Sequence, residues 1–365
     1  MYERTDHLKD RYMRAQGALL GLAIGDTVTH SSMQRSRFAA PLWMERILDR
    51  ISAHDRTYNI DRFVVPFIMN QDPKLLLMKP SSRTEWAIFT AQCLLQTKDE
   101  LSPEVLGEYW IDNLVSQSEK VRSGLAERSA IMNLSKGLKP PMCGMDNPHF
   151  YDDGAISRAV SIGIRFSPDP PKAARNAEVD AMVSHDKDGV WGAMAMASAI
   201  AYLVAGVGRD EAIERSVRYF PEGSWIKYQW EVACQLDVQK EPFDLLLEMD
   251  TKLVDKTYSY SNLAPQTLPI AFVLFKQIKG DIAQGIALAN CLPRVSDSVV
   301  PFVGALLGAE QGIASVSEGW ITRLGAISGT FVPQAAGSDL TQLATQLMDL
   351  AQGRGDDIEN HLDQT

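Results

Sequence analysis

The chain has 365 residues, of which 45% are hydrophobic and 22% are charged, an ordinary globular balance with ample material for a core. Its length suits one large domain or two small ones. Its formal net charge of -10 argues against nonspecific binding to nucleic acid or to anionic membranes, but it leaves room for a locally basic pocket that takes a phosphate-bearing ligand.

Apolar residues at helical spacing dominate the sequence. Pro171–Ser184 begins with proline, which suits a first helical turn, and Gly189–Val204 is apolar nearly all round, as a buried central helix would be. In chain order, the predicted helices are Leu8–Ile24, Phe38–Ile51, Thr84–Leu95, Pro103–Val115, Ser118–Leu134, Gly154–Phe166, Pro171–Ser184, Gly189–Val204, Asp210–Tyr219, Trp225–Cys234, Leu263–Gln277, Ile282–Asn290, Asp297–Gly312, Gly319–Leu324 and Asp339–Gln352.

Strand patterns are scarce. The short candidate strand Phe63–Ile68 contains Pro66, which cannot donate to a β ladder. We find neither a linker nor an internal repeat. We therefore predict an all-α fold, a compact orthogonal helical bundle, with a single domain over residues 1–352 and a polar tail over residues 353–365.

The four cysteines, Cys93, Cys143, Cys234 and Cys291, are too far apart for a zinc ribbon or a CxxC redox site. The N-terminal segment lacks the apolar region of a signal peptide. No run approaches the roughly 20 apolar residues of a membrane span. We expect a cytoplasmic protein that binds neither nucleic acid nor membrane, and the sequence does not indicate its oligomeric state.

Two predicted helices are crowded with small residues. Gly17 and Gly21 lie in the first, and Gly304 and Gly308 lie in a late one. Glycine inside a helix costs about 1 kcal/mol relative to alanine, so its repetition indicates a packing need. One interpretation is tight core packing. The other is that the two helices meet beneath a site, with Asp26 and Asp297 at their ends.

Several motifs follow one another in a characteristic order. They are Gly17-Ala-Leu-Leu-Gly-Leu-Ala-Ile-Gly-Asp26, Ser81-Ser82-Arg83-Thr84, Gly154-Ala-Ile-Ser-Arg158, Ser184-His185, Leu268-Pro-Ile-Ala271, Pro293-Arg-Val-Ser-Asp-Ser298 and Trp320. Together they resemble the ADP-ribosylglycohydrolase family, which includes the dinitrogenase-reductase-activating and ADP-ribosylarginine hydrolases. The resemblance runs from about Gly17 to Leu350 and implies that family's all-α fold.

The resemblance also implies a pair of divalent cations, usually magnesium, held by the Thr and Asp side chains of two boxes. Here Ser82 and Arg83 stand where the early box has aspartates, and Val295 replaces the first late one. Hard cations require several oxygen ligands, and one remaining carboxylate, Asp297, is a poor basis for two metals. We therefore expect no metal and no other cofactor.

An arginine at a position where the family has a metal ligand can still bind anions and hydroxyl groups. Arg83 could satisfy Asp297 and bind a diphosphate or ribose hydroxyls, with Arg294 adding positive charge, or it could simply replace the cation as a structural salt bridge. The expected ligand-binding residues are Asp26, Ser81, Ser82, Arg83, Thr84, Gly154, Arg158, His185, Arg294, Ser296 and Ser298.

N-glycosidic cleavage passes through an oxocarbenium-like state that a carboxylate can stabilise while another group activates water. The candidate catalytic residues are Asp297, Asp153, Asp152 and Glu85. Structural alternatives remain open: Asp152 and Asp153 as helix caps, and Glu85 as a first-turn charge. His185 is equally compatible with a structural role.

Two functions fit these residues. The first is a metal-independent N-glycosidic hydrolase acting on an ADP-ribose-like, NAD-derived or nucleoside or nucleotide substrate, with a small nucleotide or ribosyl ligand as its partner. The second is a catalytically inactive relative of the family that binds ADP-ribosylated or other partners. An aromatic cluster around Trp225 and Tyr228, with Tyr258 and Tyr260, offers stacking surfaces or core packing.

Overall fold

Helices make up the regular structure of the computed structural model, which describes residues 2–31, 57–58, 79–98, 100–255, 262–292 and 294–353, with backbone only for 2–6 and 30–31. These residues contain no strand, only an isolated antiparallel bridge between Asp152 and Leu263. The all-α prediction is confirmed. The predictions over Phe38–Ile51, Phe63–Ile68, Tyr258, Tyr260 and residues 354–365 lie outside the described residues.

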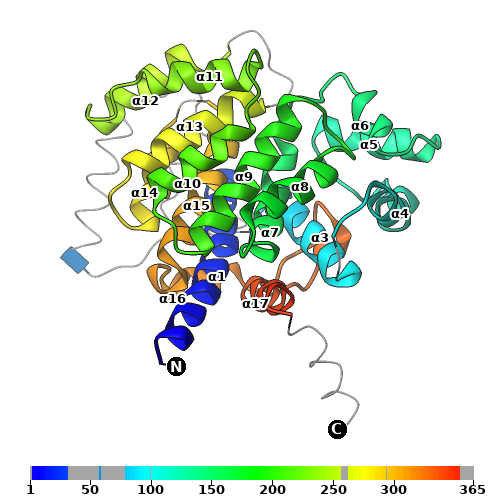
Figure 1. Ribbon diagram of the computed structural model, residues 1–365, viewed down its shortest axis with the longest axis horizontal. Helices are drawn as coiled ribbons and strands as arrows, with labels where there is room; N and C mark the ends of the chain where they lie inside the picture. The colour runs from blue at the N-terminus through cyan, green and yellow to red at the C-terminus, as the bar shows by residue number, and fades with distance from the viewer. Residues whose placement is uncertain are drawn as a thin grey trace.

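Most predicted helices are present, with ends shifted by a few residues (Figure 1). The helices are α1 (Tyr2–Ser31), α3 (Ser82–Thr97), α4 (Pro103–Asn113), α5 (Leu125–Ser135), α6 (Met142–Met145), α7 (Gly154–Arg165), α8 (Pro170–Ala181), α9 (Asp188–Val204), α10 (Arg209–Ser216), α11 (Trp225–Cys234), α12 (Pro242–Lys252), α13 (Ala264–Gln277), α14 (Ile282–Ala289), α15 (Ser296–Gln311), α16 (Glu318–Leu324) and α17 (Leu340–Ala351).

Two boundaries differ from prediction for local reasons, and two helices were not predicted. The helix predicted over Ser118–Leu134 begins only at Leu125, after Gly124 in an extended conformation. The helix predicted over Asp210–Tyr219 tightens into a 3-10 turn after Ser216. The sequence analysis missed α6, which is a single turn, and α12, which begins with proline in its first turn.

The core is built around α9, which is buried over most of its length, as its apolar sequence predicts. Helices α7 and α8 pack against it. Figure 1 shows α9 in the middle of the molecule, with α4, α5 and α6 on one side and α11 and α12 on another. No described helix is long and apolar enough to cross a membrane.

Among the helices that the structure describes, α1 and α15 make the most extensive contact, along their glycines. A Cβ on Gly21 would lie 2.0 Å from the carbonyl oxygen of Gly304, and a Cβ on Gly17 would lie 2.2 Å from that of Gly308. The pairing order shows that the helices run antiparallel. Close packing therefore brings Asp26, near the end of α1, beside the start of α15. The interpretation as tight packing is confirmed, and the interpretation as a site stays a prediction.

Candidate functional site

Asp26 anchors the start of α3. Its carboxylate is 1% exposed and accepts hydrogen bonds from the backbone N–H groups of Ser81 and Thr84, at 2.8 and 3.0 Å, and from both hydroxyls. These donors include two backbone groups that the helix start would otherwise leave unpaired. The contact fixes the Ser81–Thr84 turn against α1.

Arg83 projects from this turn toward two other helix starts. Its Nη2 lies 3.0 Å from Asp153 Oδ1 and also hydrogen bonds to Ser298 Oγ, and its Nε donates to the carbonyl of Asp297 at 2.8 Å. Burial lowers the pKa of Arg83, but the charges of Asp153, Asp297 and Asp26 outweigh it and raise the pKa. The guanidinium thus stays charged at the centre of the site.

The partner of Arg83 differs from the predicted one. The sequence pointed to the Asp297 side chain, whereas the ion pair is with Asp153, and Asp297 contributes its backbone carbonyl. The Asp297 carboxylate is exposed and accepts from Asn262 Nδ2 at 2.9 Å. Asn262 also donates to Ser298 Oγ at 2.6 Å. Asn262 was not predicted from the sequence; its place just before an expected helix was the available signal.

Asp153 is buried beside Arg83. The bridge between Asp152 and Leu263 brings the segment before α7 against the segment before α13, and the Asp153 N–H donates to the Asn262 carbonyl at 3.1 Å. Burial raises the pKa of Asp153, although Arg83 pulls it down. Its Oδ2 atom is buried and accepts no hydrogen bond within the described part of the chain. Asp153 therefore combines a charged partner with nearby hydroxyls of Ser298 and Thr267, which also lower its pKa.

Asp152 faces a different set of residues. His185 Nε2 lies 2.6 Å from Asp152 Oδ1, and His185 Nδ1 lies 2.8 Å from Ser184 Oγ. Burial raises the pKa of Asp152, but the neighbouring His185 reverses this and leaves the pKa lowered. His185 has no exposed surface. These contacts favour a structural role for His185 over direct ligand binding.

Arg158 is also part of the buried interior. Its Nε lies 2.7 Å from Asp180 Oδ2 and its Nη1 lies 3.2 Å from Glu127 Oε1, while its side chain is 0% exposed. Its guanidinium packs 5.4 Å from the ring centroid of Trp110. A ligand would have to displace this packing to reach Arg158, so the residue supports the site from behind. Sequence analysis singled out neither Glu127 nor Asp180.

Two further candidates have other partners. Glu85 is buried and accepts the N–H groups of Thr330, Phe331 and Val332 at 2.7 to 3.0 Å, which favours a role in anchoring that loop over a catalytic one. Arg294 forms an ion pair of 2.7 Å with Asp250 of α12. Among the other predicted residues, Ser82 and Ser296 are half-buried, and Gly154 begins α7.

Val295 adopts a strained conformation immediately before α15. Its φ of 55° and ψ of 9° are left-handed, a region that costs a β-branched residue about 1–2 kcal/mol. We expect Val295→Asn to raise the free energy of unfolding by about 1 kcal/mol, because asparagine enters this region readily. Urea denaturation measures the change. A lower stability would mean that the contact of Val295 with the core outweighs the strain.

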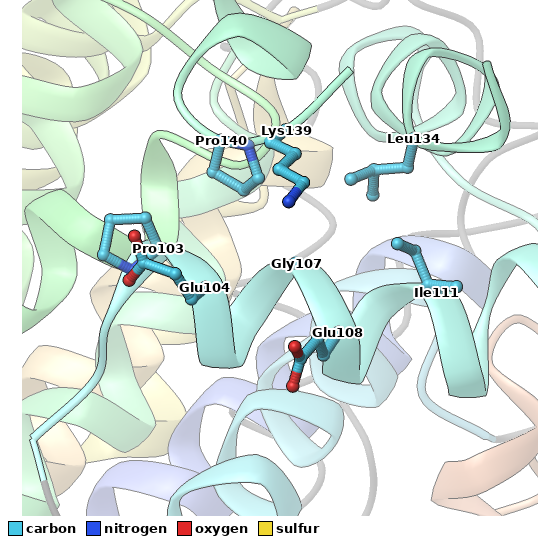
Figure 2. Close-up of a pocket in the computed structure, with 8 residues that line it drawn as sticks. All are labelled: Pro103, Glu104, Gly107, Glu108, Ile111, Leu134, Lys139 and Pro140. Carbon is cyan, nitrogen blue, oxygen red and sulfur yellow. The ribbon is translucent and has the colours of Figure 1, made fainter. Parts of the chain in front are cut away.

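A small pocket lies away from these residues (Figure 2). It is formed between α4 and the segment at Lys139 and Pro140, with Gly107 in its wall and Glu104 and Glu108 beside it. Its volume of ≈ 120 Å³ is well below the roughly 300 Å³ at which ligand sites usually begin. None of the predicted site residues lines it.

Both a family model and a solved structure match nearly the whole chain. A family model described as ADP-ribosylglycohydrolase matches residues 7–357. A solved structure titled "ADP-ribosylglycohydrolase-related protein complex" is similar with a TM-score of 0.62 and 18% identity, covering 94% of this chain and 99% of that one. At this identity the likeness concerns the fold alone. A search of curated proteins gave no match.

Proposed function

Because the chain belongs to the ADP-ribosylglycohydrolase family, we propose that it cleaves an N-glycosidic bond of an ADP-ribose-like, NAD-derived or nucleoside or nucleotide substrate without the family's magnesium pair. The family supports glycohydrolase chemistry on ADP-ribosylated substrates in general. The finer points, namely the substrate and independence from magnesium, rest on the residues around Arg83.

The donor set does not fit two divalent cations. The guanidinium of Arg83 lies among Asp153 Oδ1, Ser298 Oγ and the Asp297 carbonyl, so these oxygens already face a positive charge. Both carboxylate oxygens of Asp26 accept hydrogen bonds from the Ser81–Thr84 turn. Magnesium needs near-octahedral oxygen ligation, which this arrangement opposes with a fixed cation. We infer that Arg83 replaces the cations electrostatically.

The observation that carries the proposal is the exposure of Asp297. Among the candidate acids it alone is exposed, whereas Asp26, Asp152, Asp153 and Glu85 are buried. Asn262 orients the Asp297 carboxylate, and Arg83 lies directly behind it. In the proposed reaction, Asp297 stabilises positive charge developing on the ribose, while Arg83 is positioned to bind a diphosphate or ribose hydroxyl.

The buried acid Asp153 is the proposed partner of Asp297 in proton transfer. Its raised pKa and buried Oδ2 atom are those expected of a group that holds or accepts a proton. Tyr151, two residues before Asp153 in the chain, and Trp225 have ring centroids 6.2 Å apart and offer aromatic surface for a base. In this scheme the oxygen of a water molecule bonds to the anomeric carbon as its proton passes to the Asp153 carboxylate. The C–N glycosidic bond breaks, and the base leaves with the bonding electron pair and takes up a proton.

One observation favours the alternative of a binding protein without turnover. Arg83, Asp26 and Ser298 form hydrogen bonds with residues of the chain itself, so a ligand has to compete with internal partners. Such a protein would recognise ADP-ribosylated or other partners through the remaining exposed groups, Asp297 above all.

The decisive test is Asp297→Asn, assayed by chromatography for release of the free base or arginine from ADP-ribosyl-arginine, NAD and nucleosides. We expect turnover by the unaltered protein to be the same with and without added magnesium. The variant should lose about a hundredfold to a thousandfold in kcat, because it removes a charge that acts on the transition state.

Asp281→Asn is the matched control, since Asp281 is also an exposed aspartate at a helix start and asparagine caps helices as well. It should leave turnover unchanged. Calorimetric binding of ADP-ribose without hydrolysis of any substrate would support the binding protein instead. Turnover that requires magnesium would contradict the proposal.

A further inference from the structure

A second cluster of ligating side chains lies behind the Arg83 site. Glu127, Asp152 and His185 each offer one atom, and these atoms lie within 4.8 Å of one another. Their exposures are 2%, 3% and 0%. The three residues come from the first turn of α5, the segment before α7 and the turn before α9. Residues so distant in sequence meet only because the fold brings them together.

The cluster carries an excess of negative charge. Three buried carboxylates, on Glu127, Asp152 and Asp180, face a single buried arginine, Arg158, which contacts Glu127 at 3.2 Å and Asp180 at 2.7 Å. Three carboxylates and one guanidinium leave an excess of two negative charges before His185 is counted, and burying unpaired charge is costly.

The surroundings are shaped around the Glu127 carboxylate. A Cβ on Gly154 would lie 2.0 Å from Glu127 Oε1, and a Cβ on Gly124 would lie 2.8 Å from Oε2. Only glycine at these positions leaves the carboxylate where it is. Glycine at both positions therefore leaves room for the Glu127 carboxylate beside Asp152 and His185.

The second nitrogen of His185 is held in the manner typical of a metal ligand. Ser184 Oγ lies 2.8 Å from His185 Nδ1 and accepts from Arg158 Nη2 at 2.9 Å. This contact holds the ring with Nε2 turned toward Asp152 Oδ1. Such outer hydrogen bonds fix the tautomer of ligating histidines.

We propose that Glu127, Asp152 and His185 bind one divalent transition-metal ion of the zinc type. One imidazole and two carboxylates are ligands that zinc accepts, and the two positive charges balance the buried excess. Nε2 and Asp152 Oδ1 are 2.6 Å apart and joined through a proton. The ion would take the place of that proton, and the two atoms would separate to about 3.3 Å as each bonds to the metal at about 2.0–2.2 Å.

This site is separate from the one that the family uses for magnesium. It shares no residue with Asp26, the Ser81–Thr84 turn or Asp297, and it lies in the interior. The ion would hold α5, α7 and the start of α9 together beside Asp153. The inference does not depend on whether the protein hydrolyses anything.

The test is metal content. The full-length protein is stripped with a chelator, loaded with Zn²⁺, desalted and analysed for zinc by elemental analysis. We expect one ion per chain, and a loss of affinity of about tenfold or more in Glu127→Gln and in His185→Gln. Circular dichroism reports whether each variant folds. Glu127→Gln is nearly isosteric and removes a buried charge, so it still tests the proposal if His185→Gln misfolds.

Three controls define the result. His149→Gln alters a nearby histidine outside the cluster, and Cys234→Ser removes an exposed thiol that could take up zinc. Asp297→Asn alters the proposed hydrolytic site. All three variants should keep one zinc ion per chain. If the unaltered protein lost its zinc on desalting, the proposal would be overturned, and the cluster would be held by hydrogen bonds alone. Full zinc content in well-folded Glu127→Gln would overturn it equally.

Discussion

Gly308→Ala is expected to lower the free energy of unfolding by about 3 kcal/mol or more. The added Cβ would lie 1.9 Å from the carbonyl oxygen of Gly17 and 2.5 Å from its carbonyl carbon. Both atoms belong to the backbone of a long helix, so no side-chain rotation relieves the clash and α1 must move away from α15. The better helix propensity of alanine returns only about 1 kcal/mol. Urea denaturation followed by circular dichroism measures the loss.

Gly208→Ala is the matched control. Nothing lies within 4 Å of a Cβ at Gly208, and its φ of -63° suits any residue. Its stability should stay within about 0.5 kcal/mol of the unaltered chain. If Gly308→Ala were as stable as Gly208→Ala, the close antiparallel contact between α1 and α15 would be refuted, and with it the placement of Asp26 beside α15.

Arg83→Met is expected to cost about 3 kcal/mol at neutral pH. The substitution leaves the Asp153 carboxylate buried without its cation, and breaking a buried ion pair in this way typically costs about 3–5 kcal/mol. The lower end applies because the Arg83 side chain is 15% exposed. The double variant Arg83→Met/Asp153→Asn removes both charges and should recover most of the loss. If the free-energy changes of the two single variants simply added up in the double variant, the ion pair between Arg83 and Asp153 would be contradicted.

The pH dependence of Arg83→Met gives an independent check. Burial already raises the pKa of Asp153 above its ordinary 3.8, and removing Arg83 raises it further. An acid with a raised pKa binds its proton more tightly in the folded state. The loss of unfolding free energy caused by ionising Asp153 is therefore absent at pH values below the ordinary pKa of aspartate. This loss grows as the pH rises toward the folded-state pKa. The stability gap to the unaltered protein should therefore widen with pH, which denaturation across a pH series measures.

The sequence predicted more of the scaffold than of the side-chain pairing. Small residues at helical spacing in two segments indicated close packing, and the structure interleaves Gly17 and Gly21 with Gly308 and Gly304. Arg83 was predicted to face oxygen atoms, and its guanidinium does lie among them. These inferences succeeded because they rest on local pattern and residue type.

The partners of the charged residues were harder to predict. Arg83 pairs with Asp153 and not with the Asp297 side chain, because the segment before α7 is drawn against the segment before α13. Glu85 carries the charge expected in a first turn, yet its carboxylate anchors a loop about 245 residues later in the chain. Sequence spacing gives the face of a helix but not which distant loop packs there.

The sequence by itself determined the helical class and the glycine-lined contact of two helices. Only the tertiary structure decided which acid is exposed and which are buried, that Asn262 orients Asp297, and that Glu127 joins Asp152 and His185. The physical reason is that periodicity follows from neighbours on one helix. Exposure and charge pairing depend on how helices far apart in the chain pack, and a single sequence does not specify those contacts.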